Sequence, residues 1–293
     1  EFLSVGGNNL EASDFELLAS SPLYGQVKRV VANSNNPGRD GLVALLAGAR
    51  GQQLESINLT MTRLDEGALS VLAHGAPLER LNRLHLGWNR VGARGAAILA
   101  NSPRLPAIQE LGLARCAIGN EGLEALFTSE TLPAPRWLDI SGNSCEAKSL
   151  IALIESPWAE RLEHLDVSNN SLTAEVIAAL SKAAFTSALK GIDLAHETTV
   201  SNQRWSKAGG AKKYVSGEAA TLALLQQLDP ERVTSLDLSG SKVSLEGARI
   251  IASMKNLTSL SLDGCGLDDA TLLALVHAPD LTRLERLSVR FNE

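Results

Sequence analysis

Histidine and cysteine are the residues of this 293-residue chain that could carry catalysis or bind a metal, and both are few. The chain has five histidines and three cysteines, and Cys116, Cys145 and Cys265 form no C-x-x-C pair. No H-E-x-x-H zinc motif, Ser-His-Asp order or phosphate-binding loop is present, although glycine pairs occur in "EFLSVGGNNL" and "SKAGGAKKY". We therefore predict that the chain is not an enzyme and uses no metal or cofactor.

The elements that would position any functional group repeat at a fixed spacing. The pattern L-x-x-L-x-L-x-x-N, where L is any aliphatic residue, has ten full copies and a partial copy that begins near Leu3. Steps between the first seven copies are 27 residues, and the later steps are 44, 24 and 27. The copies begin at Val27, Leu54, Leu81, Ile108, Pro135, Leu162, Leu189, Val233, Leu257 and Leu284. A period of 20–29 residues with this consensus is typical of leucine-rich repeats.

Each copy predicts a strand, a turn and a helix. Alternating aliphatics indicate a strand with one buried face, and a following stripe such as Ala68, Val71 and Leu72 indicates a helix. Glycines at the helix starts are expected to let helix and sheet backbones approach; they are Gly41, Gly67, Gly95, Gly122 and Gly247. The predicted fold class is α/β: a curved leucine-rich-repeat solenoid of about 11 repeats, forming a single domain over residues 1–293. Its parallel sheet lines the concave face, and its helices cover the convex face.

A polar residue closes the strand pattern in most copies. Asparagine there is expected to bond to backbone groups of the adjacent turn and so to form a ladder between repeats. The ladder asparagines are Asn8, Asn35, Asn89, Asn143, Asn170 and Asn292. Other copies use Thr62, Cys116, Ser241 and Cys265, each able to make one bond. The two cysteines are therefore interpreted as structural residues rather than nucleophiles.

Composition narrows the function further. The formal charge of −6 argues against non-specific nucleic-acid binding, and no run of 18 apolar residues predicts a membrane span. An odd number of cysteines favours a reducing cytoplasm. The chain starts without Met, and neither end carries a capping repeat, so we expect a piece of a longer chain. Flanking domains or end-to-end self-association would then cover the end repeats.

The stretches "NRVGARGAAILANSPRLPAIQELGL" and "AIGNEGLEALFTSE" resemble leucine-rich repeats of the ribonuclease-inhibitor-like class. More specifically, their sequence pattern is similar to that of leucine-rich repeat proteins from myxobacteria and planctomycetes. This resemblance implies a cytoplasmic bacterial protein with a binding role, and it names no partner. The 27-residue step is slightly short for the inhibitor class.

The candidate binding residues lie between the buried aliphatics. Trp88 and Trp137 are predicted to point onto the concave side, and exposed Trp, Arg and His are the residue types that dominate interface energetics. Met61 and Phe291 continue the column of Trp88. The alternative is that the tryptophans pack sideways against neighbouring strands. The residues expected around them are Arg83, His85, Arg115, Arg136 and His164.

The 44-residue step contains 17 extra residues, placed at about 198–214. The inserted stretch "TTVSNQRWSKAGGAKKY" is basic and aromatic in an acidic chain, so it is a candidate contact for an acidic partner. A tolerated surface insertion is the alternative. Its candidate binding residues are Arg204, Trp205, Lys207, Lys212 and Lys213.

Three functions remain open from the sequence. We favour a protein-interaction scaffold that binds another protein on its concave face and inserted loop. A regulator of a partner enzyme is the second, since the repeats also resemble those of Ran GTPase activators. The third is a metal-binding or catalytic site on a stripe formed by Asp139, Asp166, Asp193 and Asp237, which could equally be a solvated stripe. His85 and His164 lie three repeats apart, roughly 14 Å on strand spacing, too far for joint proton transfer.

Overall fold

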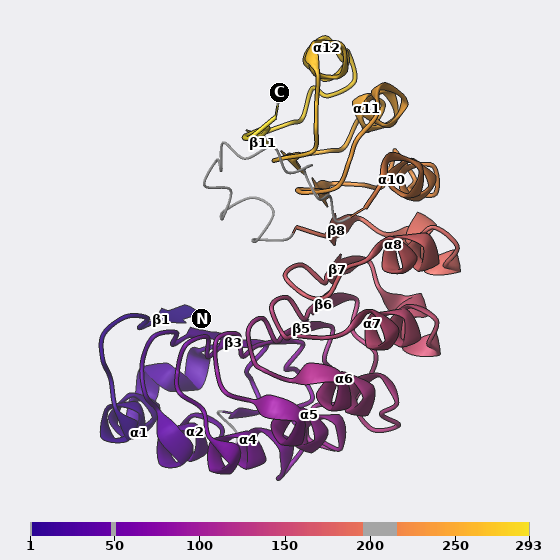
Figure 1. Cartoon of the computed structure of the whole chain (residues 1–293). Helices are drawn as coiled ribbons and strands as arrows, with labels where there is room; N and C mark the ends of the chain where they lie inside the picture. The colour runs from indigo at the N-terminus through magenta and orange to yellow at the C-terminus, as the bar shows by residue number, and fades with distance from the viewer. Residues whose placement is uncertain (1, 48–50, 196–215, 293) are drawn as a thin grey trace, which may run out of the picture. The chain divides into compact units, whose positions relative to one another are not determined.

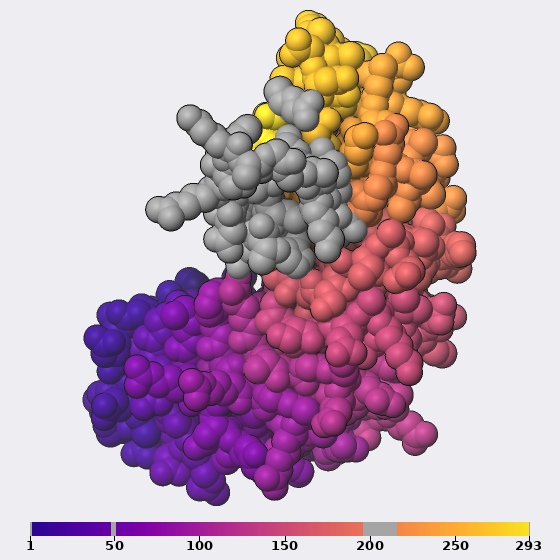
Figure 2. Space-filling model, viewed as in Figure 1, coloured from indigo at the N-terminus to yellow at the C-terminus, as the bar shows by residue number. Residues whose placement is uncertain are grey.

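The computed structural model describes residues 2–47, 51–195 and 216–292. The chain divides into two compact units, Glu1–Cys145 and Glu146–Glu293. Both units contain the same kind of repeat, in which a short strand leads through a turn to a helix (Figure 1). Figure 2 shows the first unit in indigo to magenta and the second in pink to yellow. The prediction of a single domain over the whole chain stays a prediction.

Strands of successive copies pair in parallel, in the register that the repeat predicts. Leu84 lies beside Leu111, and Leu111 lies beside Leu138. Each of these pairs joins residues 27 positions apart. Because every strand has an aliphatic residue at its central position, each copy completes the core of its neighbour. The predicted α/β leucine-rich-repeat fold is confirmed, with eleven strands among the described residues.

In the first unit the strands follow one another in chain order, and the helices all lie on one side of the sheet (Figure 1). The strands are β1 (Phe2–Ser4), β2 (Arg29–Val31), β3 (Ser56–Asn58), β4 (Arg83–His85), β5 (Glu110–Gly112) and β6 (Trp137–Asp139). The helices are α1 (Ala12–Ser20), α2 (Gly38–Leu45), α4 (Glu66–Ala73), α5 (Gly92–Ala100) and α6 (Gly119–Phe127), with the 3-10 helix η1 (Pro22–Gln26).

The second unit repeats this arrangement. Its strands are β7 (His164–Asp166), β8 (Gly191–Asp193), β9 (Ser235–Asp237), β10 (Ser259–Ser261) and β11 (Arg286–Ser288). Its α-helices are α7 (Ala147–Ile154), α8 (Ala174–Leu180), α10 (Glu218–Leu225), α11 (Leu245–Ala252) and α12 (Asp269–Val276). The 3-10 helices are η2 (Pro157–Arg161) and η3 (Ala184–Ala188).

The asparagine ladder forms as predicted and fixes the distance between repeats. The Oδ1 atom of Asn143 accepts hydrogen bonds from the backbone N–H groups of Cys116 (2.9 Å) and Ile118 (3.2 Å) in the preceding copy. Its Nδ2 atom donates to the carbonyls of Leu113 (2.7 Å) and Ile140 (2.8 Å). Asn35, Asn89 and Asn292 make equivalent bonds. Since these backbone groups are buried, leaving them unpaired would cost about 1–3 kcal/mol each.

The substitutes for asparagine differ in what they bond. Cys116 donates through Sγ to the Leu86 carbonyl of the preceding copy, and Cys265 does the same to Leu238, both at 3.2 Å. Thr62 instead donates to the Leu59 carbonyl of its own copy. The prediction of one bond for each substitute is wrong for Ser241, because its buried hydroxyl has no hydrogen-bond partner among the described residues.

The helix-start glycines serve a different contact from the one predicted. A Cβ at Gly122 would lie 3.0 Å from the Cα of Ala93, which belongs to the preceding helix, α5. A Cβ at Gly41 would lie 3.3 Å from the Cα of Ala12 in α1. These glycines therefore allow neighbouring helices to approach, and the expected helix-to-sheet approach is wrong. The sequence did not predict this contact, because the pattern of one repeat does not give the distance between its helix and the helix of the next repeat.

The long step of the repeat falls between β8 and β9. Ile192 pairs with Leu236, a separation of 44 residues where other neighbours are 24 or 27 apart. The predicted insertion at about 198–214, with Arg204, Trp205, Lys207, Lys212 and Lys213, lies outside the described residues.

No helix among the described residues has both the length and the apolar character needed to cross a membrane.

Candidate functional site

An aromatic pair lies on the exposed side of the first unit's sheet, which is called the strand face below. Trp137 of β6 is half-buried, and its ring centroid lies 5.4 Å from that of His85 on β4. In the register Gly112 of β5 lies beside His85, and Glu110 of the same strand lies beside Trp137. A Cβ at Gly112 would lie 2.7 Å from Nδ1 of His85, so the imidazole occupies the space that a side chain on β5 would take. The missing side chain of Gly112 therefore allows His85 to lean across its neighbouring strand.

Charged groups surround this pair. Arg83 Nε lies 2.9 Å from Glu110 Oε1, and both side chains are partly exposed. Burial lowers the pKa of His85 below its ordinary value, with Arg83 acting in the same direction and with Glu110 and Asp139 opposing it. Neutral imidazole is therefore the form favoured by the fold, and its ring plane is tilted by 54° from that of Trp137.

A second group lies in the turns that follow the strands. Arg115 places its guanidinium carbon 4.5 Å from the ring centroid of Trp88, within the range of a cation–π contact. Trp88 is 54% exposed, and Met61 at the equivalent position of the preceding copy is 53% exposed. The backbone N–H of Met61 donates to the Gly87 carbonyl, and that of Trp88 donates to the Ala114 carbonyl. These bonds fix the three turns side by side.

All three turn residues adopt a left-handed backbone conformation. Their φ angles are +58° for Met61, +60° for Trp88 and +52° for Arg115. Such a φ costs a non-glycine residue roughly 1–2 kcal/mol, and it is unusual for bulky residues. Gly7, Gly142, Gly240 and Gly264 occupy the same position in other copies. Large side chains therefore stand where the turn itself favours glycine.

The structure divides the predicted binding cluster. His85, Arg83 and Trp137 lie on the strand face, whereas Trp88 and Arg115 lie beside each other in the turns. Arg136 is exposed and immediately precedes β6. His164 belongs to the second unit, where a Cβ at Gly191 would lie 2.4 Å from its Nδ1.

Sequence reasoning missed two features of the turn group. It placed Met61 and Trp88 in one column but did not identify the left-handed conformation, although glycines at four equivalent positions signal it. It also omitted Arg63 and Arg90. These arginines line a hollow of about 560 Å³ together with Trp88, Leu64, Asp65, Glu66 and Asn89.

The predicted aspartate stripe has a local structural role. In the second unit, Oδ1 of Asp166, Asp193 and Asp237 each accepts a bond from the backbone N–H two residues later, at 2.9–3.0 Å. Asp139 makes the same turn with Ser141 in the first unit. Each carboxylate thus caps its own strand end. The described part of the chain contains no group of three or more His, Cys, Asp or Glu placed to hold a metal ion.

The three cysteines are buried, and burial keeps their thiols protonated at neutral pH. Burial raises the pKa of the Cys116, Cys145 and Cys265 thiols to about 12. A thiol with such a pKa carries almost no thiolate at neutral pH, and the thiolate is the nucleophilic form. The arrangement supports the structural interpretation of Cys116 and Cys265.

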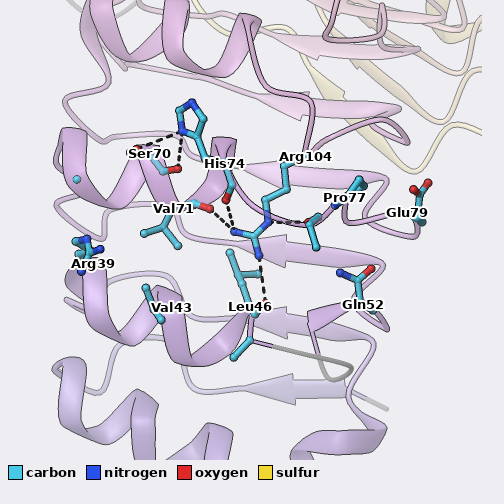
Figure 3. Close-up of a pocket in the computed structure, with 13 residues that line it drawn as sticks. Arg39, Val43, Leu46, Gln52, Ser70, Val71, His74, Pro77, Glu79 and Arg104 are labelled. Atoms are coloured by element: carbon cyan, nitrogen blue, oxygen red, sulfur yellow. Dashed lines mark hydrogen bonds between the residues drawn. The ribbon is translucent and has the colours of Figure 1, made fainter.

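A hollow of about 850 Å³ on the helix side of the first unit contains a buried cation (Figure 3). The guanidinium of Arg104 donates to the carbonyls of Leu46 (3.2 Å), His74 (2.9 Å), Ala76 (3.2 Å) and Val71. Leu46 and His74 are the residues that end α2 and α4. Because helix C-termini carry partial negative charge, Arg104 stabilises both helix ends. Its donors are occupied by the fold, so we assign it a structural role.

Comparisons with known proteins agree with the geometry. Residues 106–127 and 161–183 each match a family model described as a leucine-rich repeat. No curated protein matches the chain. Among solved structures, a chain from the crystal structure of the Rad7 and Elc1 complex in yeast is similar, with 15% identity and a TM-score of 0.57. The match covers 93% of this chain and 72% of the yeast chain, and at this identity it shows the fold alone. Stacked copies, an asparagine ladder and two matched repeats together support a leucine-rich repeat protein.

Proposed function

We propose that this chain is a protein-interaction scaffold whose strand face in the first unit contacts a partner. The observation that carries the proposal is the partly exposed Trp137, whose ring lies 5.4 Å from that of His85 beside the charged pair of Arg83 and Glu110. A large aromatic ring at a surface contributes contact area with little loss of conformational entropy, and such residues dominate binding energies. Arg83 and Glu110 supply a polar edge to this contact.

Several finer features of the proposal rest on sequence or resemblance. The inserted stretch 198–214 would add basic and aromatic contacts, and we propose a bacterial, cytoplasmic protein from the resemblance of the repeats. The role is binding rather than catalysis, with no cofactor. The yeast chain of similar fold comes from a complex of two proteins, which is consistent with this fold serving in assembly.

Replacing Trp137 by alanine tests the proposal. The full chain, immobilised, captures its partner from the native lysate, and the affinity of the purified partner is then measured for each variant. We expect Trp137→Ala to weaken binding at least 30-fold, the effect of losing about 2 kcal/mol at an interface centre. The free energy of unfolding should change by no more than about 1 kcal/mol, since the ring is partly exposed.

Phe2→Ala is the matched control, because Phe2 occupies the same register column on β1 and is also exposed. It should leave the affinity unchanged within twofold. Equal binding by Trp137→Ala and the unmodified chain would exclude the strand face as the contact. Failure to capture any specific partner would count against the scaffold itself.

A further inference from the structure

The turns of the first unit form a surface separate from the strand face. It consists of Met61, Arg63, Trp88, Arg90 and Arg115, and is called the turn rim below. Backbone hydrogen bonds place its turns side by side, from Met61 to Gly87 and from Trp88 to Ala114. The rim is therefore a fixed row rather than a set of independent loops.

The apolar members of the rim do not contribute to the core. Met61 and Trp88 each expose more than half of their surface. Both hold an unfavourable left-handed backbone conformation that glycine adopts freely at the same position of other copies. A bulky residue kept in a strained and exposed position points to a role outside the fold.

The charges of the rim are predominantly positive. Its acidic neighbours are already engaged, because Asp65 accepts from the Ala68 N–H at the start of α4 and Glu66 pairs with Arg94 at 3.4 Å. Within the described part of the chain, Arg63 and Arg90 form no ion pair. Arg115 lies over Trp88. The hollow of about 560 Å³ beside Trp88 is lined by the apolar Leu64 and Trp88, by Asn89, by Arg63 and Arg90, and by the engaged Asp65 and Glu66.

We propose that the turn rim binds an acidic segment of a protein partner, with an apolar side chain of that segment seated beside Trp88. Carboxylates would pair with Arg63 and Arg90, since guanidinium groups bind carboxylates through parallel hydrogen bonds. An extended segment matches a row of turns spaced at the strand separation of about 4.8 Å. The inference rests on the proposed scaffold function and names the chemistry of the partner.

The chain's overall charge favours a peptide over a nucleic acid as the occupant. A net charge of −6 repels a long phosphate backbone, whereas a short acidic segment meets only the local arginines.

A phage library of random 12-residue peptides, selected on the full chain, tests this proposal. We expect the selected peptides to be enriched in Asp and Glu around a large apolar residue. Their affinity, measured by fluorescence anisotropy, should fall at least tenfold on the Arg63→Glu/Arg90→Glu variant. Trp88→Gly should weaken the same peptides at least tenfold.

The Arg80→Glu/Arg161→Glu variant is the matched control, because it makes the same change of net charge at exposed arginines outside the rim. It should bind within twofold of the unmodified chain. Selected peptides without acidic enrichment, or peptides that bind the Arg63→Glu/Arg90→Glu variant equally well, would overturn the proposal. Tighter binding at the rim by a 12-nucleotide single-stranded DNA than by the peptides would also overturn it.

Trp137→Ala separates the two proposals. The native partner could fail to bind Trp137→Ala and still bind Arg63→Glu/Arg90→Glu and Trp88→Gly. That result would support the scaffold function and contradict the proposed role of the turn rim. Peptides that need the rim but bind Trp137→Ala normally would support the rim independently of the strand face.

Discussion

The turns of the two units have the same backbone but carry different side chains. In the first unit the left-handed position holds three successive bulky residues, Met61, Trp88 and Arg115, flanked by Gly7, Ser34 and Gly142. In the second unit it holds Asn169, Gly240, Gly264 and Phe291. The exposed strand position shows a similar contrast. The second unit places Asp166, Asp193 and Asp237 there, each capping its own turn, followed by Ser261 and Ser288. The first unit has Ser4, Val31, Asn58, His85 and Gly112 before Asp139, and among these Asn58 and Asp139 make the same cap.

This difference separates what the fold requires from what it tolerates. Glycine and aspartate in the second unit are the residues that such turns favour on local grounds. At three successive turns the first unit uses residues that the turn disfavours, and it leaves Met61 and Trp88 exposed. The contrast is not complete, because Phe291 ends the second unit in the same left-handed conformation and is 43% exposed. The first unit nevertheless has the longer row of bulky turn residues.

The largest expected effect comes from the ladder that both units share. Asn143→Ala should lower the free energy of unfolding by about 2–5 kcal/mol, because it leaves the buried N–H groups of Cys116 and Ile118 unpaired. Denaturant unfolding measures this loss. Asn8→Ala is the control, since its side chain makes only exposed bonds to Val5 and Gly6, and should cost less than about 1 kcal/mol. Equal losses would show that the ladder does not stabilise the copies as described.

A smaller and pH-dependent effect is expected at the second unit's aspartates. Burial raises the pKa of Asp237 above its ordinary 3.8, so the carboxyl binds its proton more tightly in the folded state than in the unfolded state. Its stabilising contribution is therefore present below pH 3.8 and is lost as the pH rises through the folded pKa. Asp237→Asn keeps an oxygen acceptor for the Ser239 N–H and removes the charge. At pH 7 it should stabilise the protein, and this gain should vanish near pH 3.

Unfolding curves of Asp237→Asn at several pH values measure this difference. Asp237→Ala, which also removes the acceptor, should be less stable than Asp237→Asn at every pH. A loss of stability in Asp237→Asn at pH 7 would mean that the charge itself is needed. The aspartates of the second unit would then do more than cap their turns.

The sequence predicted the repeat, the strand register and the ladder because these depend on which residues are buried. Leu84, Leu111 and Leu138 lie side by side because the same strand position is buried in every copy. The spacing of aliphatic residues in the sequence therefore indicates which positions are buried. The exposed tryptophan at position 88 was also predictable, since the aliphatic pattern leaves that position outside the core.

Other features depend on neighbours that a single copy does not reveal. His85 leans over Gly112, and Gly122 admits the helix of the preceding copy, so each contact is fixed by a pair of repeats. The candidate binding residues divide between strand face and turns at the left-handed turn of residue 88, which follows β4. Periodicity gives the spacing of residues along the chain, but it does not give the φ angle of a turn.

We infer that Trp88 occupies its strained turn for a partner rather than for the fold. The direct measurement is the free energy of unfolding of Trp88→Gly. Relief of the left-handed strain should offset the added flexibility of glycine and the loss of the Arg115 contact, so we expect a value within about 1 kcal/mol of the unmodified protein. A loss of about 3 kcal/mol or more, as for a tryptophan removed from a core, would contradict the account.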